Sequence, residues 1–194
     1  MKLYIVRHGE SETNRTGCWT GWLDVALTDK GIRDAERVGE TLAGIKFDKV
    51  YSSDLQRARV TAETALPGCT YETTPLLREI SLGSLEGTPI KPDWAQTLAS
   101  RTGGTVPTGG ETTEQFRARI SEFLHQMQDV PYETVAAFAH GGWLTNALSV
   151  IMGVELPRKN IYCGKCATLI LEWTGTAWRM TGWINLPEKD PERP

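Results

Sequence analysis

The pattern of apolar and polar positions divides the chain into short apolar runs separated by amphipathic stretches. Short apolar runs that end at polar or glycine residues predict buried strands. These strands are expected over residues 2–6, 49–52 and 134–139, with a closing hairpin over residues 168–173 and 178–184 around Thr174-Gly175.

The stretches between these strands repeat their apolar residues at helical spacing. Helix starts are predicted at Thr28 or Asp29, at a capping box of Ser53 with Gln56, at another of Thr112 with Gln115, and near Trp143 for a helix over residues 143–152. Strands that alternate with helices indicate an α/β fold. We therefore expect three layers, a mostly parallel central sheet with helices on both faces.

The chain of 194 residues has the length of one domain. The glycine-rich segment 102–110 is expected to be a loop inside that domain, because the same pattern of apolar runs continues on both sides of it. The predicted domain covers residues 1–186. Residues 187–194 are charged and rich in proline, which predicts a flexible tail.

Charge and composition narrow the possible partners. The net charge of −3 disfavours a general nucleic-acid binder, which usually carries a basic excess. No apolar run approaches the length of a membrane span, and the first run is interrupted too early by Arg7 and His8 for a signal peptide. We expect a cytoplasmic protein without membrane or nucleic-acid partners. The sequence predicts no oligomeric state.

Two predicted strands end in a histidine followed by glycine. The first leads into Arg7-His8-Gly9, and the strand over residues 134–139 leads into His140-Gly141. In open α/β sheets, ligands bind at the carboxyl ends of the strands. A glycine there lets the backbone turn sharply and approach a ligand closely. Each histidine alone is most simply explained as structural, but two at equivalent strand ends predict a shared site.

A third strand end adds a cation. Ser53 follows the strand over residues 49–52, and Arg57 falls in the first turn of the next predicted helix. A helix N-terminus favours anions, and a guanidinium matches two phosphate oxygens at once. Arg57 alone would be interpreted as a solvated helix residue. Together with Arg7, His8 and His140 it predicts a phosphoryl-binding pocket.

Five sequence blocks resemble the histidine phosphatase superfamily, which has the phosphoglycerate mutase-like fold. The blocks lie in family order at residues 3–14, 20–31, 51–63, 77–87 and 138–142. The resemblance implies that His8 is the nucleophile and that Glu79 protonates the leaving oxygen. It further implies that the phosphoryl oxygens are held by Arg7, Arg57 and His140, with substrate contacts from Asn14, Ser11, Thr20, Gly21 and Gly141.

These implied roles agree with the chemistry of phosphoryl transfer, which needs positioning and neutralisation of negative charge. A neutral imidazole is a good nucleophile, and a carboxylic acid can protonate an alkoxide that would otherwise leave poorly. No cofactor or metal is expected, since arginines and histidines supply the positive charge. Without the resemblance, Glu79 would be interpreted as an ion-pair partner of Arg78 or another arginine.

The branch of the superfamily is predicted from departures from the mutase pattern. The mutases of this superfamily carry a long insert with two adjacent arginines that bind the substrate carboxylate. No adjacent pair of arginines occurs in this chain. Leu82 and Ile90 stand where the mutase pattern has tyrosine and lysine, and Gly142 stands in place of asparagine. The segment 107–112 is similar to the phosphatase branch that includes α-ribazole and broad-specificity phosphatases. We expect hydrolysis of a small phosphomonoester, with a phosphoglycerate mutase or a non-catalytic phospho-ligand-binding module as alternatives.

Other conspicuous residues leave their roles open. Cys163 and Cys166 form a single C-x-x-C, for which structural cysteines are favoured over a zinc or redox site. Glu111 lies either at the pocket rim or at a helix N-terminus. Three tryptophans near the motifs, Trp19, Trp22 and Trp143, either line the entrance or pack in the core, and core packing is favoured more for Trp22 than for Trp19. His125 is expected at the surface.

Overall fold

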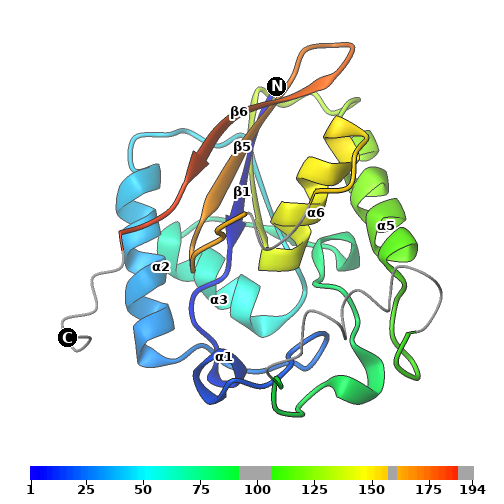
Figure 1. Ribbon diagram of the computed structural model, residues 1–194. Helices are drawn as coiled ribbons and strands as arrows, with labels where there is room; N and C mark the ends of the chain where they lie inside the picture. Colours follow the sequence, from blue (N-terminus) through cyan, green and yellow to red (C-terminus); the bar gives the residue numbers. More distant parts are fainter. Residues whose placement is uncertain (92–105, 157–160, 188–194) are drawn as a thin grey trace.

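A computed structural model describes residues 1–91, 106–156 and 161–187, and in these residues six strands form one sheet in the order β3-β2-β4-β1-β5-β6 (Figure 1). The strands are β1 Lys2–Arg7, β2 Lys49–Ser52, β3 Glu72–Thr73, β4 Thr134–Ala139, β5 Thr168–Trp173 and β6 Trp178–Ile184. The first four run parallel to one another, whereas β5 is antiparallel to β1 and β6 is antiparallel to β5. The sheet is thus mostly parallel, as predicted.

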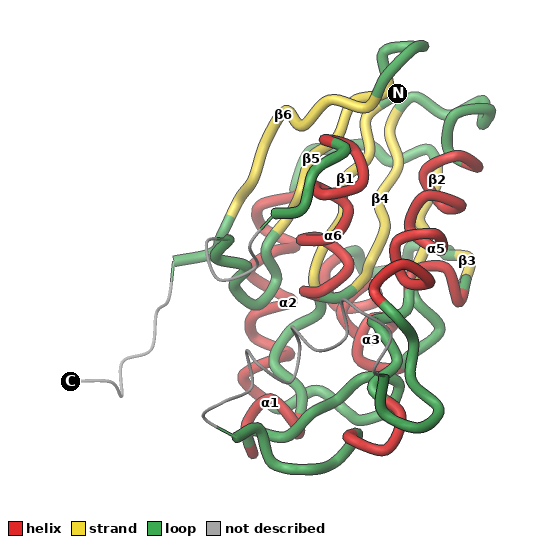
Figure 2. Tube along the Cα trace, turned by 45° about the vertical axis from the view of Figure 1, so that its right-hand side comes forward, coloured by secondary structure: helices red, strands yellow, loops and turns green. Residues whose placement is uncertain are grey.

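Helices cover both faces of this sheet (Figure 2). They are α1 Glu12–Thr16, α2 Asp29–Leu42, α3 Gln56–Ala65, α5 Thr113–Gln126 and α6 Gly141–Met152, with 3-10 turns at Pro75–Leu77 and Gly83–Leu85. Alternate residues of β4 supply the two cores: Val135 and Ala137 pack with α5 and α6, and Ala136 and Phe138 pack with α2 and α3. The three-layer prediction is confirmed.

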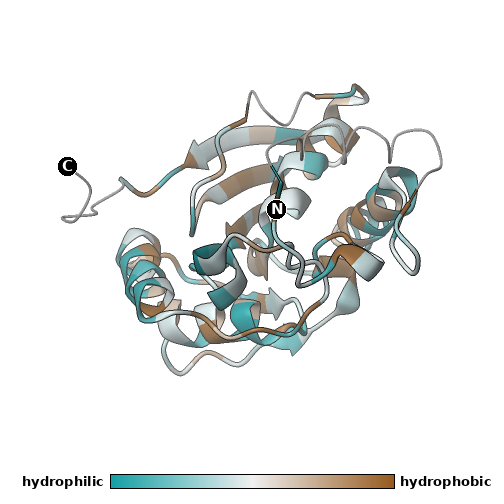
Figure 3. Ribbon diagram, turned by 60° about the horizontal axis from the view of Figure 1, so that its bottom comes forward, coloured by the Kyte–Doolittle hydropathy of each residue, from teal (hydrophilic) through white to brown (hydrophobic). Residues whose placement is uncertain are grey.

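The amphipathic character of α2 explains its place on the sheet. Its buried side includes Ala35, Val38 and Leu42, while charged residues occupy the outer side. In Figure 3 this helix, at the left of the view, carries both teal and brown stretches. Thr28 caps it by accepting a hydrogen bond from Gly31 N, which confirms one of the two candidate caps. No helix of the described ranges is long and apolar enough to cross a membrane.

One predicted cap is wrong. Helix α3 begins at Gln56 with Leu55 at the N-cap and without a side-chain cap, so Ser53 does not form the expected capping box. The Ser53 hydroxyl instead lies 2.9 Å from His140 Nε2. Asp24 caps the N-terminus of α3 instead, because its Oδ1 accepts a hydrogen bond from Gln56 N at 2.6 Å. By contrast, the capping box of Thr112 is confirmed.

Other differences lie at element ends and in short elements. Helix α6 begins at Gly141, two positions before the predicted start near Trp143. The short elements α1 and β3 and the two 3-10 turns have too little periodicity to be predicted. The predicted tail lies outside the described residues apart from Pro187, as does part of the glycine-rich segment 102–110.

Candidate active site

A cavity of about 340 Å³ opens where the carboxyl ends of β1 and β4 meet the N-terminus of α6. Its lining includes most of the residues expected from the sequence: Arg7, His8, Asn14, Thr20, Gly21, Arg57, Glu79 and Gly141. His140 lies fully buried behind this lining. The predicted convergence of separate strand ends is therefore observed.

The pairing of β1 with β4 brings the two histidines together. In this parallel pair Arg7 stands opposite Ala139, so the residues that follow each strand are neighbours. The rings of His8 and His140 lie 5.1 Å apart, centroid to centroid. The glycine after His8 is required by packing, because a Cβ at Gly9 would lie 2.2 Å from the carbonyl oxygen of Gly31.

The surroundings of His8 fix its tautomer and lower its pKa. Its Nδ1 lies 2.6 Å from the carbonyl oxygen of Gly9, which can only accept, so Nδ1 carries the proton and Nε2 keeps its lone pair. Burial, followed by the charges of Arg57 and Arg7, holds the pKa of His8 well below its usual value. The imidazole is therefore neutral at pH 7.

Arg57 is a fully buried cation held by a loop. Its Nη1 and Nη2 donate to the carbonyl oxygens of Leu23 and Gly21, each at 2.8 Å, and its Nε lies 3.3 Å from His8 Nε2. Burial lowers the pKa of Arg57 to about 10, so the guanidinium stays charged at neutral pH. Gly21 has a φ of 51°, and a Cβ there would collide with the Glu86 carboxylate. A glycine is thus needed at this anchor.

Arg7 and His140 contribute polar atoms that the protein itself leaves unmatched. Arg7 donates through Nη1 to the carbonyl oxygen of Cys163. Its Nε and the Nδ1 of His140 are buried without a hydrogen-bond partner within the described part of the chain. Gly141 lets Arg7 lie against α6, because a Cβ there would be 3.0 Å from Arg7 Nε. Buried polar atoms normally have partners, so these two suit an anionic ligand.

Glu79 supplies the one carboxylate among the described residues that line the cavity. Its Oε1 accepts from Ile80 N and its Oε2 from Gly142 N, both at 2.9 Å. A Cβ at Gly142 would lie 2.1 Å from Glu79 Oε1, so the second glycine after His140 makes room for the acid. Glu79 forms no ion pair with an arginine of the described residues, and Arg78 pairs with Asp54 instead.

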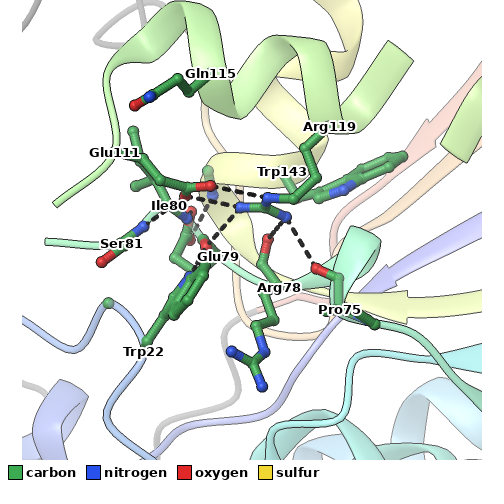
Figure 4. A network of polar contacts seen from close by, with 12 residues as sticks. Trp22, Pro75, Arg78, Glu79, Ile80, Ser81, Glu111, Gln115, Arg119 and Trp143 are labelled. Atoms are coloured by element: carbon green, nitrogen blue, oxygen red, sulfur yellow. Dashed lines mark hydrogen bonds and ion pairs between the residues drawn. The ribbon is translucent and has the colours of Figure 1, made fainter. Parts of the chain in front are cut away.

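The backbone of Glu79 is fixed by a polar network around Arg119 (Figure 4). The Arg119 guanidinium donates to the carbonyl oxygens of four residues in one short segment, Pro75, Leu76, Arg78 and Glu79. It also pairs with Glu111, whose Oε2 accepts from Ser81 N at 2.8 Å. Trp22 Nε1 donates to the Glu79 carbonyl oxygen at 2.7 Å. The network holds the segment that carries the acid.

The comparison with known families agrees with this geometry. The family model of the histidine phosphatase superfamily (branch 1) matches residues 3–186. The chain belongs to this superfamily. A 2,3-bisphosphoglycerate-dependent phosphoglycerate mutase from Brucella ovis is 34% identical over 168 residues, with coverage of 78% of this chain and 82% of that relative.

Solved structures of similar proteins share the fold. The phosphoglycerate mutase of Thermus thermophilus has a TM-score of 0.72 and 32% identity, covering 96% of this chain and 99% of that one. The phosphoserine phosphatase of Entamoeba histolytica, in complex with 3-phosphoglyceric acid, has a TM-score of 0.82 and 23% identity, covering 96% and 98%. At that lower identity the likeness shows the fold alone.

Several expected positions of this histidine phosphatase superfamily member lie away from the cavity. Ser11 is buried, caps α1 and does not line the cavity, since its hydroxyl lies against Thr13 Oγ1 at 3.2 Å. Trp143 is fully buried against Phe123, so it packs in the core rather than at the entrance. Trp19 does line the cavity.

The remaining open residues have structural surroundings. Glu111 does not line the cavity, and its carboxylate forms an ion pair with Arg119. Trp22 stacks under Arg78, whose guanidinium carbon lies 4.6 Å from the ring centroid. His125 is exposed, as expected. Cys166 is buried in the core and burial raises the pKa of its thiol, which agrees with a structural role.

The cavity residues that were missed from the sequence include Thr13 and Lys165. Thr13 Oγ1 lies 2.6 Å from Thr20 Oγ1 and joins α1 to the next loop. Lys165 lies between the two cysteines of the C-x-x-C, a motif that predicts nothing about the residues inside it. Because β5 is antiparallel to β1, the loop before β5 returns beside Arg7 and His8. The predicted hairpin did not specify that pairing.

The buried histidines predict a loss of stability in mild acid. The pKa values of both His8 and His140 are held well below 6.5, mainly by burial. The unfolded chain therefore binds more protons below pH 6.5, and stability falls as the pH decreases from there. Between pH 6.5 and 5.5 we expect the free energy of unfolding to fall by about 2 kcal/mol, about 1 for each histidine.

Urea denaturation at both pH values measures this loss. His8→Gln should reduce the loss by about half. The exposed His125 provides the matched control, and His125→Gln should leave the loss unchanged. A loss that is equal in the wild type and in His8→Gln would contradict the prediction.

Proposed function

We propose that this chain is a metal-independent phosphomonoesterase that hydrolyses a small phosphorylated metabolite through a phosphohistidine at His8. The observation that carries the proposal is the His8 Nε2 lone pair, which is fixed by the Nδ1 contact to Gly9 and adjoins the buried Arg57. A neutral nucleophile beside fixed guanidinium groups meets the main requirements of phosphoryl transfer.

In the first step, His8 Nε2 attacks phosphorus and the ester P–O bond breaks. Arg7 and Arg57 neutralise the charge on the phosphoryl oxygens, with hydrogen bonds from His140 and Asn14. The carboxyl group of Glu79 gives its proton to the leaving oxygen, which departs as an alcohol. In the second step, the Glu79 carboxylate takes a proton from water, which attacks phosphorus. The N–P bond then breaks, and phosphate leaves with His8 neutral again.

Hydrolysis is favoured over mutase activity by the lining of the cavity. Leu82 and Ile90 line it at the positions where the mutase pattern carries tyrosine and lysine. These apolar side chains cannot make the polar contacts that tyrosine and lysine would make in the mutase pattern. Mutase activity is the second candidate, because relatives at 34% identity bear that name.

A hydrolysis screen over a library of phosphomonoesters tests the proposal, with conversion of 3-phosphoglycerate into 2-phosphoglycerate measured in parallel. We expect release of inorganic phosphate from at least one class of ester and no net conversion between phosphoglycerates. Conversion that exceeds phosphate release would establish the mutase instead.

The non-catalytic alternative is tested by trapping. Rapid denaturation during turnover of a ³²P-labelled substrate should leave acid-labile label on the wild-type protein. Absence of label, together with absence of turnover across the library, would favour a phospho-ligand-binding module.

A further inference from the structure

Lys165 is a cation of the cavity that the proposed mechanism does not use. It lies on the loop before β5, which is bound to the end of β1 through a hydrogen bond from Arg7 N to the Ala167 carbonyl oxygen at 2.9 Å. Its neighbour Cys166 has a φ of 54°, a left-handed conformation that is uncommon for a residue other than glycine. Such local strain is concentrated at functional sites. Lys165 itself lines the cavity together with His8.

The surroundings of the Lys165 ammonium lack a counter-ion. Its Nζ donates to Asn14 Oδ1 at 2.6 Å. No carboxylate oxygen of the described residues lies within 4.0 Å of Lys165 Nζ, the limit for an ion pair. Burial and the charges of Arg7 and Lys30 lower the pKa of Lys165 to about 7, although Glu10 opposes them. A nearby anion would stabilise the charged form.

Charge balance indicates what that anion is. The proposed first step starts with Glu79 protonated, so the cavity cations are Arg7, Arg57 and Lys165. A phosphoryl dianion matches the two guanidinium groups, which leaves the charge of Lys165 unmatched in that state. One carboxylate balances one ammonium, whereas a second phosphate would add about two negative charges. The contact with Asn14 places the ammonium next to a residue expected to bind the phosphoryl group. A carboxylate that reached Lys165 would therefore lie close to the phosphate in the same molecule.

We propose that Lys165 forms a second anion subsite beside the phosphoryl site and selects phosphomonoesters that carry a carboxylate near the phosphate. This subsite deepens the proposed function and rests on it. The subsite is built from the loop before β5. There Lys165 would bind the acid group, in place of the two adjacent arginines that mutases have and this chain lacks.

A pair of substrates that differ only in the acid group tests the subsite. In 3-phosphoglycerate a carboxylate stands where glycerol 3-phosphate of the same configuration has a hydroxymethyl group. We expect the wild type to consume 3-phosphoglycerate with a kcat/KM at least about tenfold higher, the size expected for a charge-assisted contact. In Lys165→Met this preference should fall to within about twofold of unity. Because the preference is a ratio within one protein, it is unaffected by the folded fraction.

Lys30→Met is the matched control. The charge of Lys30 also acts on Lys165 and lowers its pKa. However, Lys30 Nζ pairs with Asp34, and Lys30 does not line the cavity. Its replacement should leave the substrate preference unchanged. If Lys165→Met lowers kcat/KM equally for both substrates, Lys165 only positions Asn14 and the subsite is refuted.

Two further outcomes separate the subsite from the proposed function. A wild type that hydrolyses p-nitrophenyl phosphate and both test substrates without preference would overturn the subsite and leave the phosphomonoesterase in place. A wild type that consumes none of the three would overturn the proposed function, and the subsite with it.

Discussion

Replacement of His8 by alanine is expected to reduce hydrolysis of every substrate by about 10⁴-fold or more, because the covalent route is lost while the rest of the cavity persists. The lone pair of this imidazole is held toward Arg57 by the Nδ1 contact to Gly9. Steady-state release of phosphate from p-nitrophenyl phosphate measures the effect, and the trapped label should disappear in the same variant.

Two variants make the loss interpretable. His125→Ala changes an exposed histidine and should retain the wild-type rate. The alanine at position 8 removes a buried ring that contacts His140, so thermal unfolding should be recorded to show that the variant is folded. Wild-type turnover by folded His8→Ala would show that the nucleophile lies elsewhere.

The parts of the fold that were predicted from the sequence have strong periodic signals. The strand over residues 134–139 was predicted with the observed bounds, because it is an apolar run between polar and glycine residues. The hairpin strands were also predicted with the observed bounds, because their apolar and aromatic residues flank the turn signal Thr174-Gly175. The rule that places ligands at the carboxyl ends of parallel strands then located His8 and His140. Strand order follows from long-range pairing, and local periodicity contains no information about it.

The missed parts of the site depend on contacts between distant segments. Lys165 reaches the cavity through the antiparallel pairing of β5 with β1. Arg119 acts through carbonyl oxygens of the segment before Glu79, about forty positions away, which no short motif encodes. Ser53 matched a capping box, but His140 and Asp24 altered the helix start from outside the motif. At Ser53, tertiary contacts therefore overrode a local pattern, whereas Lys165 and Arg119 had no local pattern that pointed to their contacts.

Glu79→Gln is expected to separate the two chemical steps. For an alkyl substrate such as glycerol 3-phosphate, removal of the acid should lower kcat by about 10²- to 10⁴-fold, since an alkoxide leaves poorly without a proton. Nitrophenolate leaves without protonation, so the first step with p-nitrophenyl phosphate should stay fast. The second step still lacks its base. Stopped-flow recording should therefore give a burst of about one nitrophenolate per active site, followed by slow turnover.

Glu86→Gln is the control for a change of charge near the cavity. The Glu86 carboxylate accepts from the backbone N–H groups of Trp22 and Leu82 but does not line the cavity. Its replacement should leave the dependence on the leaving group unchanged. If Glu79→Gln slowed the alkyl and nitrophenyl esters equally in the first step, Glu79 would act by holding Ile80 and Gly142 in place and would not be the proton donor. A first step that Glu79→Gln slows for the alkyl ester and not for the nitrophenyl ester indicates proton transfer at this carboxyl group, because neither the charge nor the loop geometry alone distinguishes the two leaving groups.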